Sequence, residues 1–206
     1  MKKKILMIAV AVCLIVLSIA GTSLAYFTDT DTKGTVFTAG NVDIQLDFTV
    51  TKTDNNIYPG MEYRDGAKIT NLGSENAYVG AIISFRGASI NTLLTDDAAV
   101  GNINNLLKGF VANGTGYAIT YKKLDNGYDV YVVKNAAIRT SEAVTLFTAV
   151  SIPETWNNAE MGALNGASVT VTAYATQTVF ADANVTAAQA LAKAFPGVWN
   201  LSGGNQ

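Results

Sequence analysis

The chain has 206 residues, of which 49% are hydrophobic and 15% are charged, and its formal net charge at pH 7 is −2. It contains one cysteine and no histidine, so an internal disulfide, imidazole metal ligands and a Ser-His-Asp triad are all excluded. The mildly acidic balance also disfavours nucleic acid and anionic lipid as partners.

The N-terminal end has the pattern of a secretory signal peptide. A basic cluster at residues 2–4 precedes an apolar run over residues 5–20, which is rather short for a membrane span of roughly 20 residues. Small Ser23 and Ala25 occupy positions −3 and −1 of a signal-peptidase site, so we expect cleavage before Tyr26. The membrane is then contacted only through the signal peptide before cleavage. The alternative is an uncleaved membrane anchor.

Removal of a signal peptide at residues 1–25 leaves residues 26–206, a length that fits one domain well and two domains poorly. This removal also takes away Cys13 and three lysines, so the mature chain is more acidic and has no cysteine. Its stability must therefore come from core burial, and no cofactor is expected.

The cleanest predicted strand is Val42–Val50, where apolar side chains alternate with polar ones. This period of two predicts Ile44, Leu46 and Phe48 in a core and their neighbours in water. Further strands are predicted, between turn residues, at Lys68–Asn71, Ala77–Phe85, Tyr117–Leu124, Tyr128–Lys134, Ala143–Ile152 and Ala167–Phe180.

Two segments favour helices, and one tight turn favours a hairpin. Ile103, Leu106, Leu107 and Phe110 recur at helical spacing. Thr186 and Gln189 have the spacing of a capping box, and Ala187–Phe195 favours a helix. The Asp125-Asn126-Gly127 turn joins two strands into a hairpin, because Asn-Gly supplies the positive φ that such turns require. The sequence thus predicts a mainly β, antiparallel sandwich with one or two short helices in connections and at the C-terminus.

Five stretches of the chain form a distinctive set: GTSLAYFTDT at residues 21–30, VFTAGNVDI at 36–44, and then YPGMEY, ITNLGSENAYVGAIISF and SVTVTAYATQTVF. Together they resemble the camelysin/TasA family of secreted biofilm-matrix fibre proteins. The resemblance implies a jelly-roll-like β-sandwich that is secreted to the extracellular matrix or cell surface of a bacterium. At residues 178–180 the chain departs from the Ala-Asp-Gly usual in the family.

The resemblance further implies a fibre subunit that assembles through its N-terminal segment. A segment at residues 26–40, with Tyr26, Phe27, Val36 and Phe37 as apolar residues, would be donated as a strand to a neighbouring copy or to a related fibre or anchor protein. The alternative for the segment is that it packs on its own domain. The alternative for the protein is a secreted monomeric binding module or a camelysin-type metallopeptidase.

The sequence offers no catalytic, cofactor-binding or metal-binding residues. Camelysins are classed as metallopeptidases, but a zincin site needs two histidines, and the carboxylates of this chain are scattered among turns. Residues 29–34 begin like a calcium loop, yet Lys33 and Gly40 stand where oxygen ligands are needed. We therefore expect a protein that is not an enzyme.

Overall fold

The computed structural model describes residues 36–39, 42–48, 58–63, 66–95, 99–111, 115–178 and 185–199. The chain divides into two compact units, Met1–Thr32 and Lys33–Gln206, and every described residue belongs to the second. The predicted signal peptide and its cleavage site lie outside the described residues. Among the residues that are described, no helix combines the length and apolar character needed to cross a membrane.

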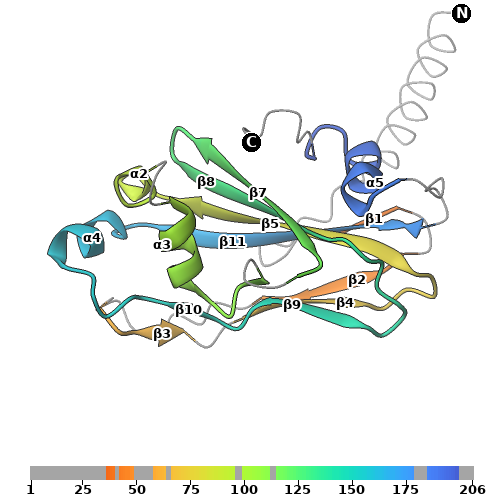
Figure 1. Ribbon diagram of the computed structural model, residues 1–206, viewed down its shortest axis with the longest axis horizontal. Coiled ribbons are helices and arrows are strands. Elements are labelled where there is room, and N and C mark those ends of the chain that lie inside the picture. Colours follow the sequence, from red (N-terminus) through yellow and green to blue (C-terminus); the bar gives the residue numbers. More distant parts are fainter. Residues whose placement is uncertain are drawn as a thin grey trace, which may run out of the picture. The chain divides into compact units, whose positions relative to one another are not determined.

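The second unit is built mainly from strands (Figure 1). The strands are β1 (Val36–Ala39), β2 (Ile44–Asp47), β3 (Glu62–Tyr63), β4 (Ala67–Asn71), β5 (Ala77–Arg86), β6 (Leu107–Lys108), β7 (Tyr117–Leu124), β8 (Gly127–Lys134), β9 (Ala143–Phe147), β10 (Ala149–Ser151) and β11 (Ser168–Gln177). The helices are α2 (Ile90–Leu93), α3 (Ala99–Leu106), α4 (Asn158–Ala163) and α5 (Ala187–Ala194).

The strands form one five-stranded sheet, β1-β11-β5-β8-β7, and two three-stranded sheets, β2-β4-β9 and β3-β10-β6. The described strands pair in antiparallel fashion with one exception, because β1 lies parallel to β11. The mainly β fold with antiparallel sheets that the sequence predicts is thus confirmed. Its layers are compatible with a jelly roll.

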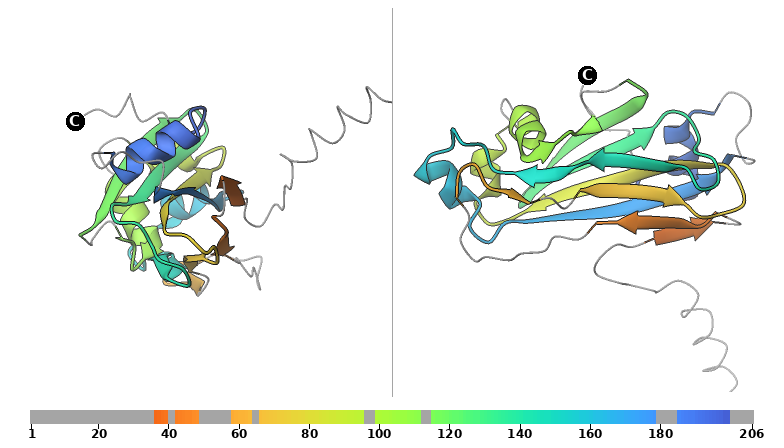
Figure 2. Two further views of the ribbon diagram at one scale, coloured as in Figure 1. Left: turned by 90° about the vertical axis from the view of Figure 1, so that its right-hand side faces the viewer. Right: turned by 90° about the horizontal axis from the view of Figure 1, so that it is seen from below.

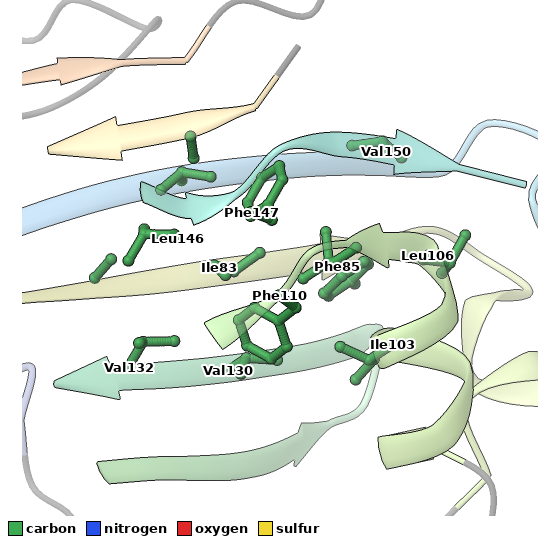
Figure 3. Close-up of a cluster of buried hydrophobic side chains, with 14 of the residues drawn as sticks. Ile83, Phe85, Ile103, Leu106, Phe110, Val130, Val132, Leu146, Phe147 and Val150 are labelled. Atoms are coloured by element: carbon green, nitrogen blue, oxygen red, sulfur yellow. The ribbon is translucent and has the colours of Figure 1, made fainter. Parts of the chain in front are cut away.

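The main core fills the space between the five-stranded sheet and the two smaller sheets. Alternate residues of the long strands point into it, as the two-residue period of a strand requires. Figure 3 shows Ile83 and Phe85 of β5 and Val130 and Val132 of β8 on one side, facing Leu146 and Phe147 of β9. All six side chains are at most 2% exposed.

The opposite face of the five-stranded sheet is covered at one end by α5 and the residues that follow it (Figure 2). Trp199 is fully buried there, and its ring makes edge contacts with Tyr131 and Tyr174 at centroid distances of 5.5 Å each. The predicted capping box of α5 is confirmed, since Thr186 and Gln189 each accept from the other's backbone N–H. This second cluster fixes the C-terminal helix on the sheet.

The strand predicted at Val42–Val50 is shorter than expected but keeps the predicted faces. Within β2 and its flanks, Val42 and Ile44 are buried while the intervening polar side chains are exposed. Leu46 and Phe48 pack on the core but are only half-buried, because β2 is the edge strand of its sheet. Val50 lies outside the described residues.

The helix predicted from the spacing of Ile103, Leu106, Leu107 and Phe110 ends earlier than the pattern suggests. All four side chains are buried, but α3 stops at Leu106 and Leu107 pairs with Val150 as a strand residue. The predicted hairpin of β7 and β8 is confirmed, with Leu124 opposite Gly127. The positive φ belongs to Gly127, at 153°, and not to Asn126.

Candidate assembly edge

The C-terminal part of the predicted assembly segment forms β1. Val36 stands opposite Ala173 and Phe37 opposite Tyr174, so this short strand extends the five-stranded sheet beyond β11. The other predicted residues of the segment, Tyr26 and Phe27, lie outside the described residues, as do Ser23 and Ala25 of the cleavage site. Within one chain, the end of the segment therefore packs on its own domain.

β11 is covered unequally on its two sides. β5 pairs with all of Ser168–Gln177, whereas β1 pairs only with Ala173–Thr176. No strand among the described residues pairs with residues 168–172 on the β1 side. Side-chain exposure in this half follows the faces of the sheet, because Val171 is buried in the main core while Ser168 and Thr170 are exposed on the outer face. Residues 168–172 of β11 thus have no partner strand on this side among the described residues, and we call this stretch the free half.

The opposite edge of the same sheet is built differently. β7 pairs with β8 along its whole length, and it exposes Lys122 and Lys123. Lysines on an edge strand disfavour the addition of another strand, because pairing would bury or crowd their charge. The β11 sequence SVTVTAYATQ contains no charged residue. Of the two edges, only the one at β11 lacks this protection.

An apolar pocket of about 90 Å³ lies beside the free half of β11. On β11, Val169 stands directly opposite Phe85 of β5, and both line the pocket. The other lining residues are contributed by β3, by α2 and α3, by the chain that follows β10 and α4, and by the first residue of β11: Tyr63, Ile90, Leu106, Ile152, Leu164, Ala167 and Ser168. Figure 1 shows these helices gathered at the end of the sheet where β11 begins.

A polar cluster joins β5 to β8 on the outer face of the five-stranded sheet. The Ser84 hydroxyl donates to Asp129 Oδ1 at 2.6 Å, and Arg86 Nη2 donates to the same oxygen at 2.5 Å. Arg86 Nη1 also donates to the carbonyl oxygens of Phe85 and Tyr128. Because the carboxylate is neutralised by the guanidinium and no histidine is present, this serine has no general base. The cluster ties two strands together.

Two tyrosines lie on the same outer face, where α5 covers it. Burial raises the pKa of Tyr131, and the Asp129 carboxylate adds to the effect while Arg86 opposes it. Burial also raises the pKa of Tyr174, with smaller contributions from Tyr131 and Asp129. Both phenols are therefore neutral at physiological pH. Their apolar rings pack against the helix, and the hydroxyl is the polar end of each side chain.

The carboxylates considered as metal ligands do not converge in the part of the chain that the structure describes. Glu62 pairs with Lys108 at 2.5 Å, and Glu160 belongs to the capping box of α4. Among the described residues no three Asp, Glu or Cys side chains gather as a metal site. The near-match to a calcium loop at residues 29–34 and the pair at Asp96-Asp97 lie outside the described residues.

The pocket and the free half of β11 were not predicted from the sequence. The pocket is lined from segments scattered between Tyr63 and Val169, and no local pattern connects them. The sequence does contain some indication of the free half, since SVTVTAYATQ is an alternating strand of ten residues without a charge. Such a strand at a sheet edge is a site for pairing.

The fold and this edge define a β-sandwich protein with one sheet edge that its described strands cover only in part. Residues 1–81 match the family described as camelysin metallo-endopeptidase, which confirms the resemblance to camelysins for that part of the chain. The matched residues include β1 to β4 and the first half of β5. Neither the curated proteins nor the solved structures include a match to the chain.

The family description implies a metal ion, and the residues present do not fit one. The whole chain lacks histidine, and the described carboxylates are bound to Lys108 and to backbone groups or are dispersed. Metallopeptidase sites of the zincin type need imidazole ligands on one helical face. We therefore derive no catalytic step from the family description.

Proposed function

We propose that this protein is a secreted structural subunit of an extracellular biofilm-matrix or cell-surface fibre of a bacterium. Subunits assemble when the segment at residues 26–40 of one copy adds as a strand to β11 of the next copy. The observation that carries the proposal is the pairing of β1 with β11, because the predicted donor segment already contributes a strand to this edge.

Strand addition suits the physical character of this edge. Backbone N–H and C=O groups along the free half of β11 have no strand partner among the described residues, and an added strand supplies hydrogen bonds to them. The uncharged sequence of β11 imposes no desolvation cost for ions. The lysines on β7 oppose the same reaction at the other edge of this sheet, so of its two edges the one at β11 is the better acceptor.

Export and processing form part of the proposal. Signal-peptidase cleavage before Tyr26 frees the N-terminus of the segment, which allows it to reach another molecule. The partners are then further copies of this chain, or related fibre and anchor proteins that present a similar edge. We propose no enzymatic activity, since the chain lacks histidine and the described carboxylates do not cluster.

Electron microscopy of the purified chain that begins at Tyr26 tests the proposal. We expect fibres from this chain and none from a chain that lacks residues 26–40. The shortened chain should keep a β-rich far-UV spectrum and a cooperative melt, because β1 contributes only four residues to one sheet. A mature chain that stays monomeric at all concentrations would contradict the proposal and favour the monomeric binding module.

A further inference from the structure

We infer that the apolar pocket beside the free half of β11 binds the Tyr26 side chain of a second copy of this chain. The inference rests on the proposed function and specifies where the donated strand is anchored. Ser168, Ala167 and Val169 bring the pocket to the start of β11, next to the edge that an added strand would occupy. A strand added to that edge would run beside residues 167–169, which line the pocket.

The chemistry of the pocket selects an apolar side chain with a polar tip. Its deeper walls are Phe85, Ile90, Leu106 and Leu164, which are at most 7% exposed. Its rim includes the exposed Ser168, whose hydroxyl offers a hydrogen-bond partner. A cavity of about 150 Å³ holds a benzene molecule, so a volume of about 90 Å³ takes part of an aromatic ring and leaves its hydroxyl at the rim.

The donor segment has a two-residue pattern that identifies its inward face. The even-numbered positions 26, 28, 30, 32, 34 and 36 read Tyr, Thr, Thr, Thr, Gly and Val, without a charge. All the charges lie at odd positions, on Asp29, Asp31 and Lys33. In the β1 register Val36 stands opposite Ala173, which is buried in the main core. A donated strand with this parity directs Tyr26 inward and the charges outward.

The register explains why the occupant comes from a second copy. In the ladder of β1, Tyr26 lies ten residues before Val36, about 33 Å away if the segment is extended. The pocket at Ala167 lies only six residues before Ala173, about 20 Å along β11. An extended segment of the same chain therefore passes beyond the pocket, and it cannot slide because it continues into β2 after Ala39.

A strand from another molecule is free to shift along β11. A shift of four residues keeps the inward face and sets Tyr26 opposite Ala167 and Val36 opposite Gln177. The donated strand then pairs with all of β11, and Tyr26 reaches the pocket, which the chain's own segment does not do in the β1 register. The anchored ring favours the neighbour's strand over the chain's own. Cleavage before Tyr26 leaves this residue at the strand's free end.

The experiment uses mature chains that begin at residue 26 and measures fibre growth by light scattering and electron microscopy. We expect Tyr26→Ala to slow fibre growth at least tenfold, and Tyr26→Phe to retain most of it. The matched control is Tyr58→Ala, which removes an exposed tyrosine ring outside the donor segment and should have little effect. On the acceptor side, Ala167→Phe fills the pocket and should also abolish fibres. Its control is Ala143→Phe, which adds equal bulk at an exposed position of β9, away from β11.

Mixing the two defective chains isolates a single interface. Tyr26→Ala retains an open pocket and Ala167→Phe retains a competent donor strand, so an equimolar mixture should give discrete dimers and no fibres. Far-UV spectra and melting curves establish that each variant is folded. Fibres from Tyr26→Ala at the wild-type rate would overturn the inference while the proposed function stands. Absence of fibres from the wild-type chain would instead contradict the proposed function.

A disulfide test keeps the inference falsifiable if Ala167→Phe does not fold. The mature chain has no cysteine, so Tyr26→Cys combined with Ala167→Cys introduces the only pair, on two residues that stand opposite each other in the shifted register. We expect a ladder of covalent oligomers on a non-reducing gel, because each bond joins two copies. A closed monomer would show that the pocket binds the chain's own segment and would overturn the inference.

Discussion

The two edges of the five-stranded sheet are closed in different ways. At one edge, β7 and β8 are neighbours in sequence, joined by a tight turn and paired along eight residues, with lysines exposed on the outer strand. At the other edge, β11 is covered over four of its ten residues by a strand from the opposite end of the chain. The β7 edge is completed by local pairing when the domain folds, and its lysines disfavour the addition of a further strand. An edge that depends on a distant segment is the one at which a strand from another molecule can be exchanged for the chain's own.

The largest effect is expected at the locally closed edge, from Gly127→Ala. Gly127 has a φ of 153°, and a Cβ atom there would lie far inside the van der Waals distance of the Phe85 carbonyl oxygen. Since β5 and β8 pair at this point, the backbone must move, and we expect a loss of about 3 kcal/mol of unfolding free energy. Chemical denaturation measures this loss.

Gly116→Ala provides the matched control at the other end of the hairpin. Gly116 also has a positive φ, of 94°, but a Cβ atom would meet nothing within 4 Å. Only backbone strain remains, so the expected loss is about 1 kcal/mol. Equal losses for the two variants would show that the close approach of β5 and β8 does not govern the stability of this edge.

A smaller effect is expected at the open edge, where charge tests the register of the donated strand. In the shifted register Asp29 and Asp31 of the neighbour stand opposite Thr170 and Thr172 on the outer face. Replacing both threonines by Asp places like charges opposite each other, which should weaken association by about 1 kcal/mol, or roughly fivefold. Replacing both by Lys should leave association unchanged or strengthen it. Critical concentrations from sedimentation measure both outcomes.

The unshifted register makes the opposite prediction for Thr170. There Lys33 would stand opposite this residue, so Thr170→Asp would strengthen association and Thr170→Lys would weaken it. Thr170 is exposed, so neither change should alter the domain's own unfolding free energy by more than about 0.5 kcal/mol. The sign of the effect therefore decides between the registers.

The difference between the two edges also explains how much was predictable from the sequence. The β7–β8 edge was predicted in detail, because alternation over Tyr117–Lys134 and a turn ending in Gly127 are local signals. The parallel pairing of β1 was not predicted, because the register of Val36 with Ala173 joins residues far apart in the chain. Local patterns specify a hairpin, whereas a parallel ladder depends on the completed fold.

The boundary between α3 and β6 illustrates a second limit of the sequence. Leu106 and Leu107 are both buried, and their spacing from Ile103 fits one face of a helix. The helix nevertheless stops between them, because Leu107 pairs with Val150 and completes a sheet. Leu106 instead lines the pocket. The sequence indicated that these residues are buried, but not that one wall of the pocket is formed at this transition.

The smallest effect is expected from Lys122→Thr, which removes one of the lysine charges that disfavour strand addition at the β7 edge. Lys122 is exposed, and its cross-strand neighbour Asp129 is already bound by Arg86 and Ser84. We therefore expect a change of less than about 0.5 kcal/mol in unfolding free energy.

Fibres of Lys122→Thr should still form from end to end, because β11 is unchanged. An edge with one lysine fewer should, however, favour contacts between fibres. Light scattering and electron microscopy would detect this as bundling, which Lys122→Arg, with its charge retained, should not cause. Loss of fibres in Lys122→Thr would mean that β7 takes part in end-to-end assembly, and the contrast between a closed and an open edge would fail.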